Sequence, residues 1–509
     1  MEEVLLGDAP LELPQVVSVA RGAKPVAISL AARRRIREGR TLVEKWTREG
    51  RRVYGITTGF GALADVAVDA SQAKRLQTNV LLSHAAGVGE PFPEEVVRGA
   101  MLLRIQDATL GRSGLSEEVV DRIVLFLNRG IFPLVPSQGS VGASGDLAPM
   151  AHMFLPLIGQ GTVTYMGEKM SASELHRRMG LQPLELGPGE GLALINGTQV
   201  MTAIGALAVW DAMDLVRVAD IACAMSLEVL LGTRTEFDPR IHKLRPHPGQ
   251  AISADNMLRI TASSEIVSSH KDCSRIQDAY TLRCSPQVHG ASRDAIFFAK
   301  KVIETEINSA TNNPLIFPET GEFLLGGNFH GQPVAMAMDF LAMAVAELAS
   351  ISERRIERLI NPHLSGLPAF LVQDGGLNSG FMIAQYTAAS LVSENKILAH
   401  PACVDSIPTS ANKEDHVSMG TIAARKARKV IENTQHVLAI ELMCAAQALD
   451  LFTDLKAGVG TQKAYQVIRS RIPHLDEDRL LATEMEKAVK LVRNRELLRA
   501  VEEAVGPLG

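Results

Sequence analysis

Apolar residues recur at helical spacing over long stretches in the later part of the chain. Five such stretches span residues 197–231, 291–310, 333–360, 379–398 and 417–452, and each is rich in Ala, Met and Leu. Within the third, the charges at Asp339, Glu347 and Glu353 follow the same helical period. Stretches this long exceed ordinary globular helices, and several are apolar on more than one face. We therefore expect a bundle of long helices packed against neighbouring helices or subunits.

In the first 200 residues, glycine and proline repeatedly interrupt the helical spacing of apolar residues. One cluster is Gly55, Gly59 and Gly61, and another contains Pro133, Pro136, Gly139, Gly142 and Gly145. Such clusters mark breaks between shorter elements. Residues 461–505 carry charges at helical spacing and predict a peripheral helical cap. The predicted fold is mainly α, with a smaller loop-rich domain over residues 1–200 and a long-helix bundle with its cap over residues 201–509.

Composition narrows the functional class. Hydrophobic residues make up 46% of the 509-residue chain, enough for a large core, while aromatic residues make up 4% and the net charge is −5. That balance is not typical of a nucleic-acid-binding protein. The five cysteines show no C-x-x-C spacing, which indicates free thiols in a reducing compartment. The acidic start, Met1-Glu2-Glu3, is unlike a secretory signal, so we expect a cytoplasmic protein that contacts no membrane.

The run Ala143-Ser144-Gly145 can modify itself chemically. If the amide nitrogen of Gly145 attacks the carbonyl carbon of Ala143, a five-membered ring closes and one water leaves. Loss of a second water from Ser144 then produces an exocyclic methylene. The product is a methylidene-imidazolone, an electrophile that no unmodified side chain supplies. Gly145 lacks a Cβ, so its backbone can adopt the tight approach, and Asp146 could accept or relay protons.

The longer string Gly-Ser-Val-Gly-Ala-Ser-Gly-Asp-Leu-Ala-Pro at residues 139–149 resembles the signature of the aromatic amino acid ammonia-lyases. Members of that family act on histidine, phenylalanine or tyrosine, and related aminomutases share the chemistry. The resemblance extends over essentially the whole chain. It implies a 4-methylidene-imidazol-5-one formed from Ala143, Ser144 and Gly145, with no external cofactor and no metal. It also implies a homotetramer whose sites draw residues from several subunits, acting on a small amino-acid substrate.

Further motifs of the same family assign roles to other residues. Tyr54, in Tyr-Gly-Ile-Thr-Thr-Gly-Phe-Gly, corresponds to the base that removes the substrate β-proton. A phenol with its ordinary pKa of ~10 is a poor base at neutral pH, so its pKa must be lowered or its proton relayed. Asn196 would donate hydrogen bonds to an oxygen that gains charge. The motif Gln-Asp-Ala-Tyr-Thr-Leu-Arg makes Arg283 the partner of the substrate carboxylate. Residues expected to line or face the site are Gln277, Tyr280 and Phe329.

Two positions bear on the choice of substrate. Ser83-His84 resembles the Ser-His pair of the histidine-specific members, and Glu414 stands where those members carry a glutamate. A carboxylate can hold one ring nitrogen of an imidazole and stabilise its cationic form. Beside a benzene ring, the same carboxylate would be buried without a partner, at a cost of several kcal/mol. His84 and Glu414 therefore favour L-histidine, with trans-urocanate and ammonia as products.

Some features leave alternatives open. Lys413, Thr57, Gln106 and Asn312 depart from the usual family residues, and Lys413 could neutralise Glu414. Tyrosine and phenylalanine therefore remain possible substrates, and an aminomutase would share the same signature. Whether the substrate amine or its ring attacks the electrophile is also open. The fumarase type is disfavoured because its Ser-Ser-x-Met-Pro loop is missing, and a non-catalytic scaffold would not need the intact tripeptide. His242 and His247 match no metal-site spacing.

Overall fold

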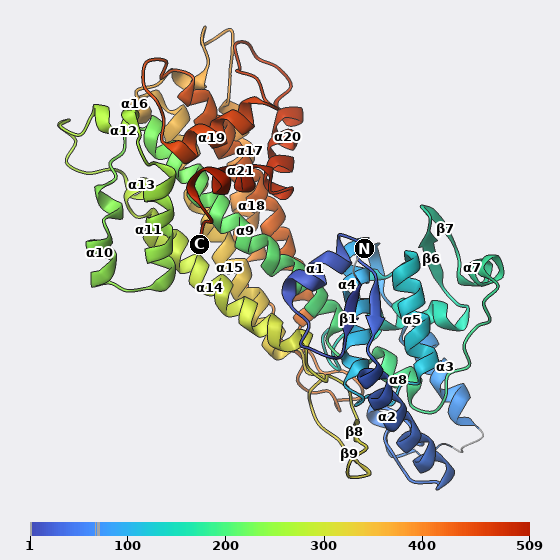
Figure 1. Ribbon diagram of the computed structural model, residues 1–509. Coiled ribbons are helices and arrows are strands. Elements are labelled where there is room, and N and C mark those ends of the chain that lie inside the picture. The colour runs from blue at the N-terminus through green and yellow to red at the C-terminus, as the bar shows by residue number, and fades with distance from the viewer. Residues whose placement is uncertain (1–2, 67, 69–71) are drawn as a thin grey trace. The chain divides into compact units, whose positions relative to one another are not determined.

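The computed structural model describes residues 3–66, 68 and 72–509 and is mainly α-helical, as predicted. Figure 1 shows the ribbon. The residues form two compact units. Unit 1 contains Met1–Trp210, Lys300–Asp339 and Pro401–Arg425, and unit 2 contains Asp211–Ala299, Phe340–His400 and Lys426–Gly509. These units do not test the predicted division into residues 1–200 and 201–509, which stays a prediction.

Unit 1 consists of short elements separated by turns, as the glycine and proline pattern predicts. Its helices are α1 (Leu13–Ala20), α2 (Leu30–Arg48), α3 (Ala73–His84), α4 (Glu94–Thr109), α5 (Glu117–Arg129), α6 (Leu147–Phe154), α7 (Ala172–Met179) and α8 (Glu190–Ile195), with 3-10 turns η1 (Gly61–Leu63) and η3 (Leu155–Ile158). Local sequence sets these limits: the Ser116 hydroxyl accepts the Val119 N–H and begins α5, and Gly130 ends it at φ +67°.

The strands of unit 1 are three or four residues long and form small sheets of two or three strands. They are β1 (Val4–Leu6), β2 (Val26–Ile28), β3 (Val88–Pro91), β4 (Ile131–Pro133), β5 (Pro136–Gln138), β6 (Thr162–Tyr165), β7 (Glu168–Ser171), β8 (Leu315–Phe317) and β9 (Glu322–Leu324). The β1–β2 pair is parallel, and β3–β5, β4–β6–β7 and β8–β9 are antiparallel. The β3–β5 pair leads directly into the chain segment that carries the tripeptide.

Four long helices contribute residues to both units. They are α9 (Gln199–Val229), α14 (Ser285–Ile307), α15 (Gln332–Ile360) and α18 (Gly420–Leu449), which confirms the long helices predicted from the apolar stretches. In unit 2 they lie side by side around a polar core. His289 of α14 contacts Asp220 of α9, and Glu441 of α18 accepts hydrogen bonds from Ser226 of α9 and Ser352 of α15.

Unit 2 is completed by shorter helices. They are η4 (Thr235–Phe237), α10 (Pro239–Leu244), α11 (Pro248–Ile260), α12 (Glu265–Ser269), α13 (Tyr280–Arg283), α16 (Pro362–Ser365), η5 (Ala369–Leu371), α17 (Met382–Leu398), α19 (Val459–Arg469), α20 (Leu481–Arg493) and α21 (Glu496–Val505). The predicted helical segment at 461–505 is therefore helical but divided into three parts. Its first break lies near Pro473, which cannot continue a helix.

Two helices, α9 and α15, are long and apolar enough to span a membrane. Their most apolar windows have mean hydropathies of 1.3 and 1.8, but 78% and 67% of those windows are buried inside the structure. Core helices of bundles have the same composition, so this is weak support for a membrane protein.

Candidate active site

A pocket of about 850 Å³ in unit 1 brings together five of the residues that the sequence predicted for the site. Tyr54, His84, Ser144, Asn196 and Glu414 all line it. They come from the loop before η1, the end of α3, the loop before α6, the end of α8 and the loop before α18. The rest of the lining is largely apolar, so polar groups are few and face a partly enclosed space.

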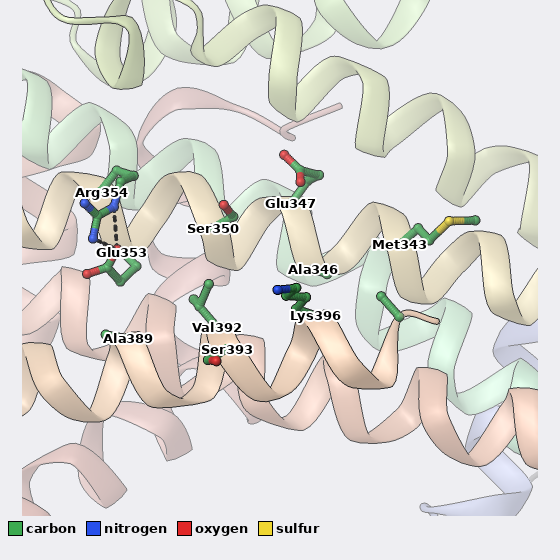
Figure 2. A pocket seen from close by; sticks show the side chains of 11 residues that line it. Met343, Ala346, Glu347, Ser350, Glu353, Arg354, Ala389, Val392, Ser393 and Lys396 are labelled. Atoms are coloured by element: carbon green, nitrogen blue, oxygen red, sulfur yellow. Dashed lines mark hydrogen bonds and ion pairs between the residues drawn. The ribbon is translucent and has the colours of Figure 1, made fainter. Parts of the chain in front are cut away.

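A second hollow, of about 720 Å³, lies in unit 2 between α15 and α17 (Figure 2). Its polar lining includes Glu347, Lys396 and Glu353, and the Glu353 carboxylate accepts a hydrogen bond from Arg354 at 2.6 Å. None of the residues that line it was predicted for the site. The unit 1 pocket is therefore the candidate active site.

The backbone around Ser144 forms a tight turn that requires glycine. Gly145 has φ +78°, and a Cβ there would collide with the carbonyl of Gly197. Residues 144–146 pair with Gly197 through two backbone hydrogen bonds. The Gly197 N–H donates to the Ser144 carbonyl at 3.1 Å, and the Asp146 N–H donates to the Gly197 carbonyl at 2.8 Å. The close contact with Gly197 thus excludes any side chain at residue 145.

The side chains of the tripeptide also suit the methylidene-imidazolone that the family resemblance implies. Ala143 is 8% exposed and packs in a small apolar cluster, while Ser144 lines the pocket. Nearby, the buried Asn196 Oδ1 has no hydrogen-bond partner among the described residues, whereas its Nδ2 donates to the Asn313 carbonyl at 3.1 Å. The Nδ2 group carries two hydrogens, so one is left to donate into the pocket that Asn196 lines together with Ser144.

Asp146 joins the turn to the start of α9. Its Oδ2 accepts the N–H groups of Val200 and Met201, both at 2.9 Å, in the first turn of that helix. Its Oδ1 accepts the Thr421 hydroxyl at 2.5 Å. Burial raises the pKa of Asp146 to about 6, although these hydrogen bonds oppose the shift. The carboxyl group therefore anchors the turn and also titrates close to neutral pH.

Tyr54 lines the pocket and belongs to the glycine-rich loop. Its hydroxyl accepts the Gly61 N–H at 3.1 Å. Burial raises the pKa of Tyr54 above its ordinary value, and the nearby Glu414 carboxylate adds to the effect, while the Gly61 hydrogen bond opposes it. The resemblance requires a lowered pKa or a proton relay. In this environment the pKa is not lowered, so the phenol is neutral at pH 7.

His84 and Glu414 share the pocket with Ser144. The imidazole Nδ1 lies 3.0 Å from the Ser83 hydroxyl, and burial lowers the pKa of His84, so the ring is neutral at pH 7. The Glu414 Oε2 accepts the Thr409 hydroxyl at 2.8 Å. Lys413 is exposed, and within the described part of the chain the Glu414 carboxylate is paired with the Thr409 hydroxyl and not with Lys413. The carboxylate therefore remains available to the pocket.

The other predicted site residues lie elsewhere. Gln277, Tyr280 and Arg283 belong to unit 2 and contact one another: Arg283 donates to the Gln277 Oε1 and lies 5.1 Å from the centre of the Tyr280 ring. Phe329 belongs to unit 1 and is half-buried, but it does not line the pocket. The roles expected for these four residues stay predictions.

Comparison with known proteins decides the family. A family model described as aromatic amino acid lyase matches residues 11–470. The chain belongs to the aromatic amino acid lyase family. Among relatives, it is 53% identical to the histidine ammonia-lyase of Alkaliphilus metalliredigens over 508 residues, covering 100% of both chains.

Solved structures of the family have the same fold. The chain resembles histidine ammonia-lyase from Trypanosoma cruzi with a TM-score of 0.92 and 42% identity, covering 99% of this chain and 96% of that one. It also resembles tyrosine aminomutase from Streptomyces globisporus with a TM-score of 0.94 and 37% identity, covering 99% of both. The predicted family and the mainly α fold are thus confirmed.

Sequence reasoning missed several residues that shape the pocket of this lyase. The Ser410 hydroxyl accepts the Ala62 N–H at 3.2 Å and ties the Glu414 loop to the Tyr54 loop. Ser410, Ala411 and Asn412 all have positive φ, between 52° and 69°. Three consecutive left-handed residues are unusual outside glycine. The only sequence signal for this turn is the polar string after Pro408, which indicates a loop but not its partner.

Proposed function

We propose that this protein removes ammonia from L-histidine and releases trans-urocanate. The observation that carries the proposal is the meeting of Glu414, His84 and Ser144 in one pocket. Full-length similarity to histidine ammonia-lyases supports it. A carboxylate and a neutral imidazole are partners for an imidazole ring, whereas a benzene ring would leave the carboxylate unpaired.

The proposed prosthetic group is the 4-methylidene-imidazol-5-one formed from Ala143, Ser144 and Gly145, with no external cofactor and no metal. When formed, it supplies an electrophile that activates the substrate for loss of ammonia. The glycine-only turn at residue 145 and the position of Ser144 in the pocket lining support its presence.

The chain's own residues bind the substrate and move its protons. We assign the β-proton to the Tyr54 phenolate, whose formation requires alkaline pH or transfer of its proton to another group. Glu414 holds the imidazole nitrogen of the substrate, and His84 contacts the same ring. Asn196 would donate its remaining N–H to the oxygen that gains charge. Arg283 would pair with the substrate carboxylate through its planar fork of donors, beside Gln277 and Tyr280, and Phe329 would lie near the prosthetic group.

We further propose a cytoplasmic homotetramer with active sites shared between subunits. Tyr280 is 69% exposed in the single chain, which is unusual for a residue that lines an active site. Unit 2 also exposes large apolar side chains, including Phe298, Phe340 and Tyr386 at 45% or more. Apolar surface of this kind is typical of protein interfaces.

Product analysis tests the substrate assignment. The purified protein is incubated in parallel with L-histidine, L-tyrosine and L-phenylalanine, and the unsaturated acids are followed by ultraviolet absorbance. We expect urocanate from histidine and little product from the other two. Coumarate from tyrosine without urocanate would overturn the assignment. Magnetic resonance of the products separates an aminomutase, which would accumulate a β-amino acid, from a lyase.

A further inference from the structure

The segment Val417–Thr421 lies along the self-processing turn. The Met419 N–H donates to the Val141 carbonyl at 2.9 Å, and the Ser418 hydroxyl donates to the Gly142 carbonyl at 3.3 Å. The side chains of Val417 and Met419 pack with Ala143 in one buried apolar cluster. The segment therefore holds the approach to the tripeptide through both its backbone and its side chains.

Ser140 spans the tripeptide from one side to the other. Its hydroxyl accepts the Gly142 N–H at 3.2 Å and donates to the Gly145 carbonyl at 3.2 Å. Gly142 directly precedes Ala143, and Gly145 supplies the nitrogen that would close the ring. One hydroxyl group thus connects both ends of the turn.

Thr421 connects the Ser140 hydroxyl to Asp146 and to helix α18. Its hydroxyl lies 3.0 Å from the Ser140 hydroxyl and 2.5 Å from the Asp146 carboxyl group. Thr421 is 3% exposed and belongs to the first turn of α18, so its position is set by that helix. Met419, two residues earlier, has φ +55°, a conformation that persists only where the surroundings enforce it.

A turn held in this way favours ring closure for an entropic reason. An unrestrained peptide seldom brings the nitrogen of residue 145 onto the carbonyl carbon of residue 143. Fixing two reacting groups in the right geometry removes that cost before the reaction begins. The closure needs no oxidant: one carbon–nitrogen bond forms, and two water molecules leave with their oxygens from Ala143 and Ser144.

We propose that Val417–Thr421 is an intramolecular template for ring closure, and that Ser140 and Thr421 are its positioning residues. This inference rests on the proposed self-formed electrophile and concerns how it matures. Thr421 follows Asp146 by 275 residues in the sequence. Ring closure must therefore wait until this late segment has docked, so the electrophile forms only in a chain whose unit 1 is assembled.

Mass spectrometry of the maturing chain tests the template. Full-length protein is produced by cell-free synthesis, and samples are quenched in acid at successive times. The mass of the peptide that contains residues 143–145 is then measured after digestion. Loss of the mass of two waters reports ring closure without any activity assay. The variants are Thr421→Val and Ser140→Ala. Thr421→Ser keeps the hydroxyl, and Thr434→Val removes another buried threonine hydroxyl from α18, one bonded to the Val430 carbonyl.

In the folded, soluble fraction, Thr421→Val and Ser140→Ala should close the ring roughly tenfold more slowly, equivalent to ~1.4 kcal/mol in the barrier. Thr421→Ser and Thr434→Val should mature at nearly the parental rate. The template is wrong if both test variants mature normally, or if Thr434→Val is slowed as much as Thr421→Val. If Thr421→Val is insoluble, Ser140→Ala alone decides. A parental chain that never loses two waters would refute the electrophile itself, which is a different outcome.

Discussion

Glu414 is the residue on which the choice of substrate depends. Its carboxylate is oriented by the Thr409 hydroxyl, and its backbone by the paired residues 409 and 414. These contacts use only one of the two carboxylate oxygens, so the other can accept a hydrogen bond from an imidazole N–H. A charge-assisted hydrogen bond of this kind is stronger than a neutral one.

Replacing this carboxylate by an amide should weaken histidine turnover. Glu414→Gln keeps the size and loses the charge, so we expect kcat/KM for histidine to fall by roughly 10- to 100-fold, the equivalent of about 1.5–3 kcal/mol. Steady-state urocanate formation measures it. Asp415→Asn is the matched control, because Asp415 is exposed on the same loop and does not line the pocket. Equal losses in the two variants would contradict a specific role for Glu414.

The pH dependence of the reaction should report Tyr54. Because burial raises the pKa of Tyr54, the phenolate fraction grows throughout the alkaline range, and kcat/KM should rise with pH beyond pH 9. Tyr54→Phe should lower activity by more than ~100-fold and abolish this rise. Initial rates between pH 6 and 10.5, in parent and variant, test the assignment. A parental profile that is flat above pH 7 would show that the raised pKa does not control the rate.

At the scale of elements, the start of α9 depends on a carboxyl group from outside the helix. Asp146 accepts two N–H groups of the first turn, a position where negative charge is favourable. Burial nevertheless raises its pKa to about 6, so the folded protein binds this proton more tightly than the unfolded chain does. Its contribution to stability is therefore greatest at low pH and is lost as the pH rises through about 4 to 6.

Asp146→Asn tests that sign. The parent loses stability as Asp146 ionises between pH 4.5 and pH 7, whereas the amide cannot ionise. The thermal midpoint of the variant, measured against that of the parent, should therefore be higher at pH 7 than at pH 4.5. The expected relative gain is a few degrees, the effect of about 1–2 kcal/mol in a large domain. Differential scanning calorimetry at both pH values measures it. If the midpoint of the variant falls relative to the parent at pH 7, the attraction between the carboxylate and the start of α9 is stronger than the effect of burial.

Sequence periodicity was a reliable guide to elements and a poor one to their contacts. The long helices were predictable because their apolar faces repeat over many turns, as in α15. The union of Tyr54, His84, Ser144 and Glu414 in one pocket was expected only through family resemblance. Thr409, Ser410 and Thr421 were not predicted at all. Thr409 acts within a local turn, while Ser410 and Thr421 contact residues hundreds of positions earlier, and neither kind of contact leaves a periodic signal.

At the scale of the whole molecule, the exposed apolar surface of unit 2 predicts assembly. Phe298 and Phe340 form an edge-to-face pair at 5.7 Å, yet they are 50% and 45% exposed. Phe340→Asp should break the assembly and lower activity by at least ~10-fold. Light scattering after size-exclusion chromatography measures the mass. Met166→Asp, at an exposed residue in the β6–β7 turn, should change neither the mass nor the activity. A parental monomer with full activity would contradict the shared-site proposal.

The central claim is that an electrophile built from residues 143–145 deaminates histidine. The most direct measurement is the rate of urocanate formation by the parent and by Ser144→Ala at equal concentrations of folded protein. Ser144→Ala has no hydroxyl to lose and cannot form the methylene. We expect the parent to produce urocanate and the variant to be slower by more than ~10³-fold. Parental activity in Ser144→Ala would contradict the account.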